Sequence, residues 1–365
     1  MKATCNLIRP DNGVRVMISV SFYRIDRKLQ STFNSRLSKM VAVAAQGPDF
    51  TGVDEKLEVA LEELATYYQK NQLKPNPSKT QVCAFHLKSN DARRKLEIHW
   101  RGERLEHCTT PRYLGVTLDR SLSIRQHCIN TKGKVSVPNN ILRKLTGIAW
   151  GAQPETPRSS ALALCVSTAE YAAPAWTASA HAKHVDVAIN ETARIVAGCL
   201  KPTPVNSLYP LIGVGAPLVR RAAATDAERT KQETDARHSL HQHEPAGRRL
   251  RSRKNFMARS HTHEGSIESN RVTRWTQQLT TREPPREEMA QGKHLPFAVW
   301  KSLNRLRTGV ARCKTNLLMW GMSEDDDVMC SCGQLQDMSG TLLGVENNLK
   351  KQPPKGFAIK INVIS

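Results

Sequence analysis

The sequence is poor in aromatic residues and in long apolar runs. Phe, Trp and Tyr make up 5% of its 365 residues, so extended platforms for stacking nucleic-acid bases are not expected. No apolar run approaches the roughly 20 residues that cross a bilayer. Charged residues such as Asp11 and Arg15 interrupt the N-terminal region, where a signal peptide needs an apolar stretch. We therefore expect an intracellular protein of the nucleus or cytoplasm, with no membrane partner.

Cysteines give no disulfide framework. The nine cysteines are scattered singly, apart from Cys330 and Cys332. Small secreted domains instead carry many cysteines close together, and their disulfides support a small core. The spacing favours a reduced, intracellular setting.

Acidic residues are outnumbered. The chain has 54 Lys and Arg against 33 Asp and Glu, a formal net charge of +21. Such a charge attracts polyanions, of which nucleic acid is the commonest, and it confers no sequence preference. The expected partners are RNA and DNA, bound non-specifically. A merely solubilising excess of basic residues is the alternative.

Hydrophobic patterning predicts an α+β fold. Apolar residues recur at helical spacing over 53–72, and Thr51 or Asp54 could cap this helix. Strand-like runs surround it, at 14–25, 41–45, 80–87, 96–105 (a hairpin) and 113–118. A helix with a small antiparallel sheet is typical of α+β proteins.

The second half of the chain reads mostly as helix and linker. Residues 122–200 are predicted to be helical, with a kink at Pro138. Apolar residues are sparse between 220 and 285, which favours a basic linker that is poorly ordered when unbound. Residues 297–310 form a short amphipathic helix by their spacing. The expected divisions are 1–40, 41–120, 121–217, 218–290, 291–345 and a tail at 346–365.

Three segments carry a family resemblance. They are Leu-Lys-Pro-Asn-Pro-Ser-Lys-Thr-Gln at 73–81, Tyr-Leu-Gly-Val-Thr-Leu-Asp at 113–119 and Asn-Asn-Ile-Leu-Arg-Lys-Leu-Thr-Gly at 139–147. In this order and spacing they resemble reverse transcriptases of non-LTR (LINE-type, jockey-like) retrotransposons. Segments 167–171 and 190–195 add to the resemblance, which runs from about 41 to 220 and returns more weakly between 297 and 345.

The resemblance implies an architecture. Residues 41–120 correspond to the distal palm of the polymerase, and 121–217 to its helical thumb and connection. Residues 218–290 are then a basic linker, and 291–345 a C-terminal helix with a degenerate cysteine knuckle. The fold expected from the resemblance is the remnant of a polymerase palm, a helical thumb, and a basic, partly disordered C-terminal region after a divergent segment at 1–40.

The resemblance also implies nucleic-acid contacts. Lys79 matches a lysine near the incoming triphosphate, where an ammonium screens phosphate charge; the alternative is an ordinary turn residue. Tyr113, Leu114 and Gly115 match the primer grip, although alternation alone would explain a core strand there. Cations of the thumb and of an arginine-rich arm are expected to follow the nucleic-acid backbone, unless they form ordinary solvated faces. They are Lys132, Lys134, Arg143, Lys144, Arg248, Arg249, Arg251, Arg253 and Lys254.

The family's catalytic centre has no counterpart. In the family a Tyr-Ala-Asp-Asp turn precedes the apolar strand, and its aspartates bind two Mg²⁺ ions that activate the primer hydroxyl. The aligned residues here are Leu37, Ser38, Lys39 and Met40. A lysine repels a metal ion, so we expect no catalytic residues, no Mg²⁺ cofactor and no polymerase activity.

The family's terminal zinc knuckle is degenerate as well. Cys330 and Cys332 match its start, but the His and Cys that should follow are missing. Since a closed zinc site needs four donors, no metal site is expected.

Three hypotheses follow. The first is an element-derived pseudoenzyme that retains non-specific nucleic-acid binding. The second is an active RNA-directed DNA polymerase whose upstream part is missing from the sequence. The third is a basic RNA- or DNA-binding protein that uses residues 248–254, with the helical part as scaffold.

Overall fold

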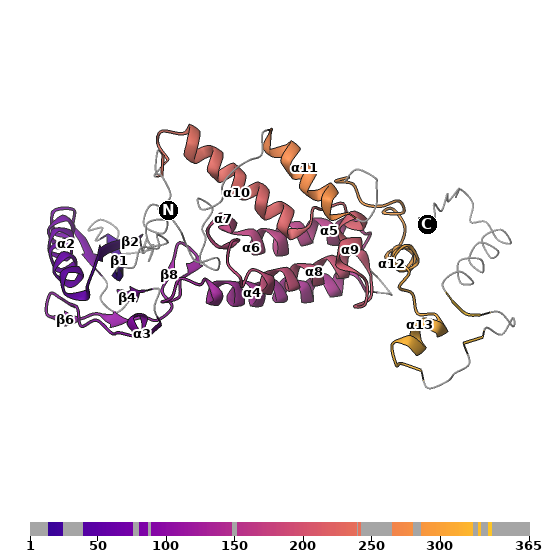
Figure 1. The fold of residues 1–365 in the computed structure, drawn as a ribbon, viewed down its shortest axis with the longest axis horizontal. Coiled ribbons are helices and arrows are strands. Elements are labelled where there is room, and N and C mark those ends of the chain that lie inside the picture. The colour runs from indigo at the N-terminus through magenta and orange to yellow at the C-terminus, as the bar shows by residue number, and fades with distance from the viewer. Residues whose placement is uncertain are drawn as a thin grey trace, which may run out of the picture. The chain divides into compact units, whose positions relative to one another are not determined.

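A computed structural model shows an α+β chain of helices and small, mainly antiparallel sheets (Figure 1). It describes residues 14–24, 39–75, 80–86, 89–147, 152–238, 240–241, 265–279, 286–323, 328–329 and 335–337. The chain divides into two compact units. Unit 1 comprises Met1–Lys132, Glu170–Val185 and Arg221–Ile267, and unit 2 comprises Gly133–Ala169, Asp186–Arg220 and Glu268–Ser365.

Unit 1 contains a five-stranded sheet with the order β2-β1-β4-β7, in which β3 also pairs with β1. β1 (Val14–Arg24) pairs antiparallel with β2 (Lys39–Gly47) on one side, and with β4 (Gln81–Phe85) and β3 (Leu73–Pro75) on the other. β7 (Glu106–His107) joins β4 in parallel. The division that we placed after residue 40 thus falls inside β2, which pairs with β1 in the same sheet.

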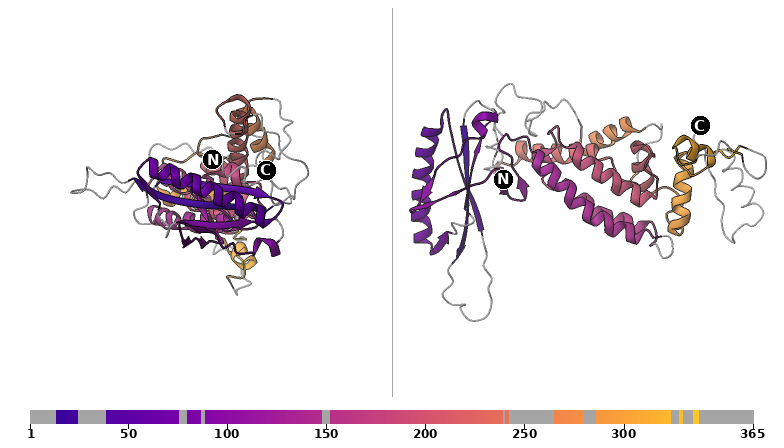
Figure 2. Two further views of the ribbon diagram at one scale, coloured as in Figure 1. Left: turned by 90° about the vertical axis from the view of Figure 1, so that its left-hand side faces the viewer. Right: turned by 90° about the horizontal axis from the view of Figure 1, so that it is seen from below.

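Helix α2 (Phe50–Lys70) packs against this sheet (Figure 2). The buried side chains of α2 recur every three or four residues, as a single apolar face requires. They meet a strand face on which Val16 lies opposite Ala84, and Ile18 opposite Val82. Each fully buried aliphatic side chain contributes about 2 kcal/mol to this core. The helix predicted over 53–72 is confirmed.

The predicted cap of α2 is wrong. Asp49, one residue before the helix, has extended backbone angles, and its Oδ1 accepts the Gly52 amide at 2.8 Å. Thr51 and Asp54 lie inside the helix, so neither has the non-helical backbone that a capping residue needs. A hydrophobic pattern locates the middle of a helix better than its first residue, because a cap depends on backbone angles outside the pattern.

Two hairpins extend unit 1. β5 (His99–Trp100) and β6 (Glu103–Arg104) form the predicted hairpin, with Arg101 and Gly102 both at positive φ in the turn. The single strand predicted over 113–118 is wrong. Instead β8 (Arg112–Tyr113) and β9 (Val116–Thr117) pair around a turn in which Leu114 and Gly115 have φ of 45° and 82°. The alternating hydrophobicity of 113–118 predicted a continuous strand, because Leu114 is apolar, but Leu114 is exposed in the turn.

Helices dominate the remaining described chain, as predicted for 122–200. α4 (Arg125–Leu145) continues through Pro138, and α4, α8 (Lys183–Ala197) and α10 (Pro217–Thr234) contribute residues to both units. The others are α3 (Ser89–Ala92), α5 (Glu155–Ser160), the π-helix η2 (Ala161–Val166), α6 (Ser167–Glu170), α7 (Ala173–Trp176), α9 (Val205–Ile212), α11 (Ile267–Gln278), α12 (Phe297–Arg307) and α13 (Lys314–Met319).

Parts of the expected linker over 218–290 are helical. All of α10 except its first residue, Pro217, lies inside the interval, and so does the whole of α11. Both helices have buried residues despite their polar composition: Val219 and Ala222 in α10, and Trp275, 2% exposed, in α11. A single large apolar side chain can anchor a polar helix, and the low average hydrophobicity of the whole interval hides such a residue.

Candidate nucleic-acid interface

Helix α4 carries charge of one sign only. Its 21 residues include five Lys or Arg and no Asp or Glu. α2 has the same length but contains five acidic residues and two lysines. Five like charges on one helix repel one another, and an external polyanion relieves that repulsion. The cations of α4 are Arg125, Lys132, Lys134, Arg143 and Lys144.

These cations do not share one face of the helix. A helical residue turns by about 100° relative to its predecessor, and Val135, Asn139 and Leu142 define the buried side. On that geometry Lys144 lies opposite the buried side. Lys132 and Arg143 lie next to the buried side in one direction around the helix, and Lys134 lies next to it in the other direction. All four side chains are exposed.

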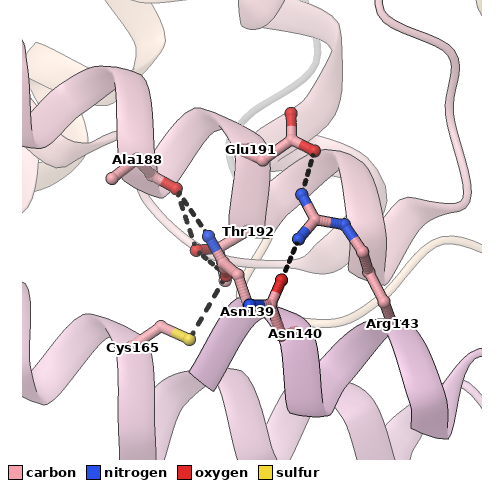
Figure 3. Close-up of polar contacts among 7 residues, drawn as sticks. All are labelled: Asn139, Asn140, Arg143, Cys165, Ala188, Glu191 and Thr192. Atoms are coloured by element: carbon pink, nitrogen blue, oxygen red, sulfur yellow. Dashed lines mark hydrogen bonds and ion pairs between the residues drawn. The ribbon is translucent and has the colours of Figure 1, made fainter. Parts of the chain in front are cut away.

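The buried side of α4 in unit 2 is fixed by Asn139 (Figure 3). Asn139 is 3% exposed. Its Oδ1 accepts the Thr192 hydroxyl at 2.7 Å and the Cys165 thiol at 3.5 Å, and its Nδ2 donates to the Ala188 carbonyl at 3.3 Å. One side chain thus joins α4 to α8 and to η2. Buried polar groups satisfied in this way fix the register of packed helices.

Arg143 bridges α4 and α8 at the surface. Its Nη1 donates to Asn140 Oδ1 at 2.7 Å, and its Nη2 pairs with Glu191 Oε1 at 2.9 Å (Figure 3). Both partners of the ion pair are about half exposed, so the pair contributes at most about 1 kcal/mol. Its main effect is to hold the guanidinium in place.

Arg143 and Glu191 also line a cavity of about 290 Å³ inside unit 2. Five cationic side chains and one carboxylate contribute to the wall, a balance of four positive charges. The charged residues are Arg143, Arg194, Lys201, Lys301, Arg305 and Glu191. Except for Arg143, the sequence did not indicate these cations, because residues 194–201 and 301–305 lie about a hundred positions apart.

The far wall of the cavity comes from α12, whose side chains hold the C-terminal end of α8. Trp300 Nε1 donates to the Val196 carbonyl at 3.0 Å, Asn304 Nδ2 to the Ala197 carbonyl at 2.9 Å, and Arg305 Nε to the Gly198 carbonyl at 2.9 Å. The last carbonyls of a helix have no partner within the helix itself. Side chains of α12 donate hydrogen bonds to three carbonyls at this end of α8. The backbone at Gly198 lies so close to α12 that a Cβ placed on Gly198 would be 2.7 Å from Lys301 Cβ.

Electrostatics in this cavity disfavour additional positive charge. Burial lowers the pKa of Lys301, and the neighbouring Arg305 and Arg312 guanidinium groups lower it further. Burial similarly lowers the pKa of Arg305, with Arg312 as the next cause. The Cys199 thiol on the same wall has its pKa raised to about 11, chiefly by burial, so it is protonated near neutral pH.

In unit 1, the expected primer-contact residues sit in the β8–β9 turn. The Tyr171 hydroxyl donates to the Leu114 carbonyl at 2.8 Å. A Cβ at Gly115 would lie 2.8 Å from Tyr171 Cε1, so only glycine allows this approach. The turn leads to Asp119, whose carboxylate accepts the amides of Ser123 and Arg125 and thereby caps the start of α4.

The other expected site residues are only partly described. Lys39 and Met40 lie in β2, opposite Phe22 and Ser21. Lys79, Leu37, Ser38, residues 248–254, Cys330 and Cys332 lie outside the described residues. Within the described ranges, no group of three or more His, Cys, Asp or Glu side chains could hold a metal ion. No described helix has both the length and the apolar content to span a bilayer.

Comparison with protein-family models, curated proteins and solved structures gives no match to this chain.

Proposed function

We propose that the chain is a catalytically inactive derivative of a non-LTR retrotransposon reverse transcriptase, and that it binds RNA and DNA non-specifically through their phosphates. In this proposal α2 and the strands β2, β3, β4 and β7 of unit 1 descend from the distal palm, and α4 with its neighbours from the thumb. The cations of α4 contact the nucleic-acid backbone.

The observation that carries the binding proposal is the charge of α4. Five cations without an acidic residue lie on one helix, and Lys134 and Lys144 are exposed. Neither has an ion pair among the described residues. Phosphate contacts of this kind supply affinity without sequence choice, because the charge of the backbone is the same for every sequence.

Support for the ancestry comes from contacts between segments that the resemblance singled out separately. The segment at 113–119 contacts the one at 167–171 through Leu114 and Tyr171. The segment at 139–147 contacts the one at 190–195 through the Asn139–Thr192 hydrogen bond and the Arg143–Glu191 ion pair.

Support for inactivity comes from β2. The positions aligned with the aspartate pair include Lys39 and Met40, which are strand residues paired with β1. Two Mg²⁺ ions need several carboxylate ligands, which this strand lacks.

Two assays test the proposal. The chain should bind a duplex and a single-stranded RNA of the same length at roughly 50 mM salt, where electrostatic association is strong. Primer extension on an RNA template with Mg²⁺ or Mn²⁺ should give no product. Absence of binding at that salt concentration refutes the binding proposal, and any template-dependent product refutes inactivity and supports an active polymerase.

Replacement of Arg248, Arg249, Arg251 and Arg253 by alanine separates the two candidate surfaces. If α4 is the main contact, this variant keeps most of its affinity. A Lys134→Ala/Lys144→Ala variant of α4 then loses more. A larger loss of affinity in the arginine variant than in the α4 variant would assign binding to the arginine-rich arm.

A further inference from the structure

The cavity of unit 2 has an unusual surplus of charge for its size. About 290 Å³ of space is at the lower end of the range for small-molecule sites. Five cations and one carboxylate surround it. Glu191 is already paired with Arg143, so the other four cations face the space with no carboxylate partner among the described residues.

The guanidinium of Arg194 has few hydrogen-bond partners among the described residues. Its only hydrogen bond among the described contacts runs from Nη2 to the Thr203 carbonyl and is long, at 3.4 Å. Its Nε is shielded from solvent and has no hydrogen-bond partner in the described part of the chain. Among the described residues, no carboxylate compensates the charge of Arg194, and an anion in the cavity would do so.

Two other arginines of the wall are held in place by hydrogen bonds. Arg305 is fixed by its bond to the Gly198 carbonyl, and Arg143 by Asn140 and Glu191. Cations placed in advance lose little conformational freedom when an anion arrives, which favours binding.

We propose that this cavity binds a phosphate monoester, the phosphate group at the end of a nucleic-acid strand or of a free nucleotide. A monoester carries close to two negative charges at neutral pH, against one for a phosphate inside a strand. The surplus of four positive charges suits the more highly charged group. Arginine forks bind its oxygens in pairs, and the lysines act as point charges. The inference deepens the proposed function, and binding of a strand end in the cavity rests on that proposed function.

The lowered pKa of Lys301 agrees with this assignment. Burial and two neighbouring guanidinium groups disfavour its ammonium form. An anion in the cavity would stabilise that form, so binding should raise the pKa of Lys301.

The test compares two single-stranded oligonucleotides of identical sequence, one with a 5′-phosphate and one with a 5′-hydroxyl. Fluorescence anisotropy should show the phosphorylated strand binding about tenfold more tightly, as expected for added charge-assisted hydrogen bonds. Inorganic phosphate and adenosine monophosphate serve as competitors. Either should weaken binding of the phosphorylated strand toward that of the hydroxyl strand.

The variants are Lys301→Met, which keeps the aliphatic stem against Gly198, and Lys201→Ala at the exposed rim. Both should abolish the preference for the 5′-phosphate while the hydroxyl strand still binds. Lys144→Ala, opposite the buried side of α4, is the matched control, because it should weaken both strands and keep their ratio. Circular dichroism confirms that each variant is folded.

The outcomes separate the two proposals. Equal affinity for both strands, with no direct binding of inorganic phosphate in calorimetry, overturns the cavity assignment and leaves the proposed function intact. A different result would be that the protein binds inorganic phosphate or the mononucleotide but neither strand, and that Lys301→Met abolishes this binding. That result supports a free phosphate ligand in the cavity and refutes the proposed function.

Discussion

Replacing Asn139 by alanine should loosen the packing of α4, α8 and η2. Asn139 makes three hydrogen bonds from a site that is 3% exposed. Removing it leaves a small cavity and takes an acceptor from both Thr192 and Cys165. Thr192 keeps a second bond, to the Ala188 carbonyl at 3.1 Å, so the full cost of three lost bonds does not apply. We expect a loss of about 2 kcal/mol in local stability.

Hydrogen exchange measures this loss where it occurs. A change of about 2 kcal/mol corresponds to roughly thirtyfold faster exchange of the protected amides, since about 1.4 kcal/mol is a factor of ten. The effect should appear in peptides covering residues 133–145 and 186–197. Asn140→Ala is the control, because Asn140 is the next residue on the same helix but is exposed and should change stability by less than about 0.5 kcal/mol. Equal exchange in the two variants would refute the role given to the buried network.

Three further predictions concern turns and one thiol. Asp119→Ala should cost about 2 kcal/mol in thermal or chemical denaturation, because it removes the acceptor for two amides at the start of α4; an unchanged midpoint would contradict this. Gly115→Ala should cost at least about 1 kcal/mol, since Gly115 has φ of 82° and would bring its Cβ to 2.8 Å from Tyr171 Cε1; wild-type stability would show that the turn is not tight. Alkylation of Cys199 should rise about tenfold per pH unit up to pH 10 without levelling, because its pKa is raised to about 11 and the thiolate is the reactive form; a plateau below pH 9 would contradict that pKa.

The sequence predicted the elements whose signals are local. The 3–4 spacing over α2 and the strand-like runs of β1 and β4 placed these elements near their observed bounds. The β5–β6 hairpin was predicted because Arg101-Gly102 is a recognisable turn. In contrast, Leu114-Gly115 lies in an alternating run, and the turn was read as strand. An apolar residue at the tip of a turn breaks the correlation between apolar character and burial.

The candidate site could be predicted only in part. The cations of α4 belong to one contiguous segment, and their charge is visible in the sequence. The cavity is different, because its wall joins the end of α8 to α12. Trp300, Asn304 and Arg305 were visible as parts of an amphipathic helix, yet nothing local indicates that they donate to the last carbonyls of α8. Contacts across such a sequence distance depend on tertiary packing, which a hydrophobic period does not encode.

The salt dependence of duplex DNA binding tests the central claim most directly. The logarithm of the binding constant should fall linearly with the logarithm of the salt concentration, with a slope of about 0.9 for each phosphate contacted. Lys134→Ala/Lys144→Ala on α4 should reduce that slope by about two contacts. The matched Lys56→Ala/Lys70→Ala variant of α2, a helix with an acidic surplus, should leave it unchanged. Equal slopes for the α4 variant and the wild type, or binding that ignores salt, would contradict the assignment of α4 as the phosphate-contacting surface.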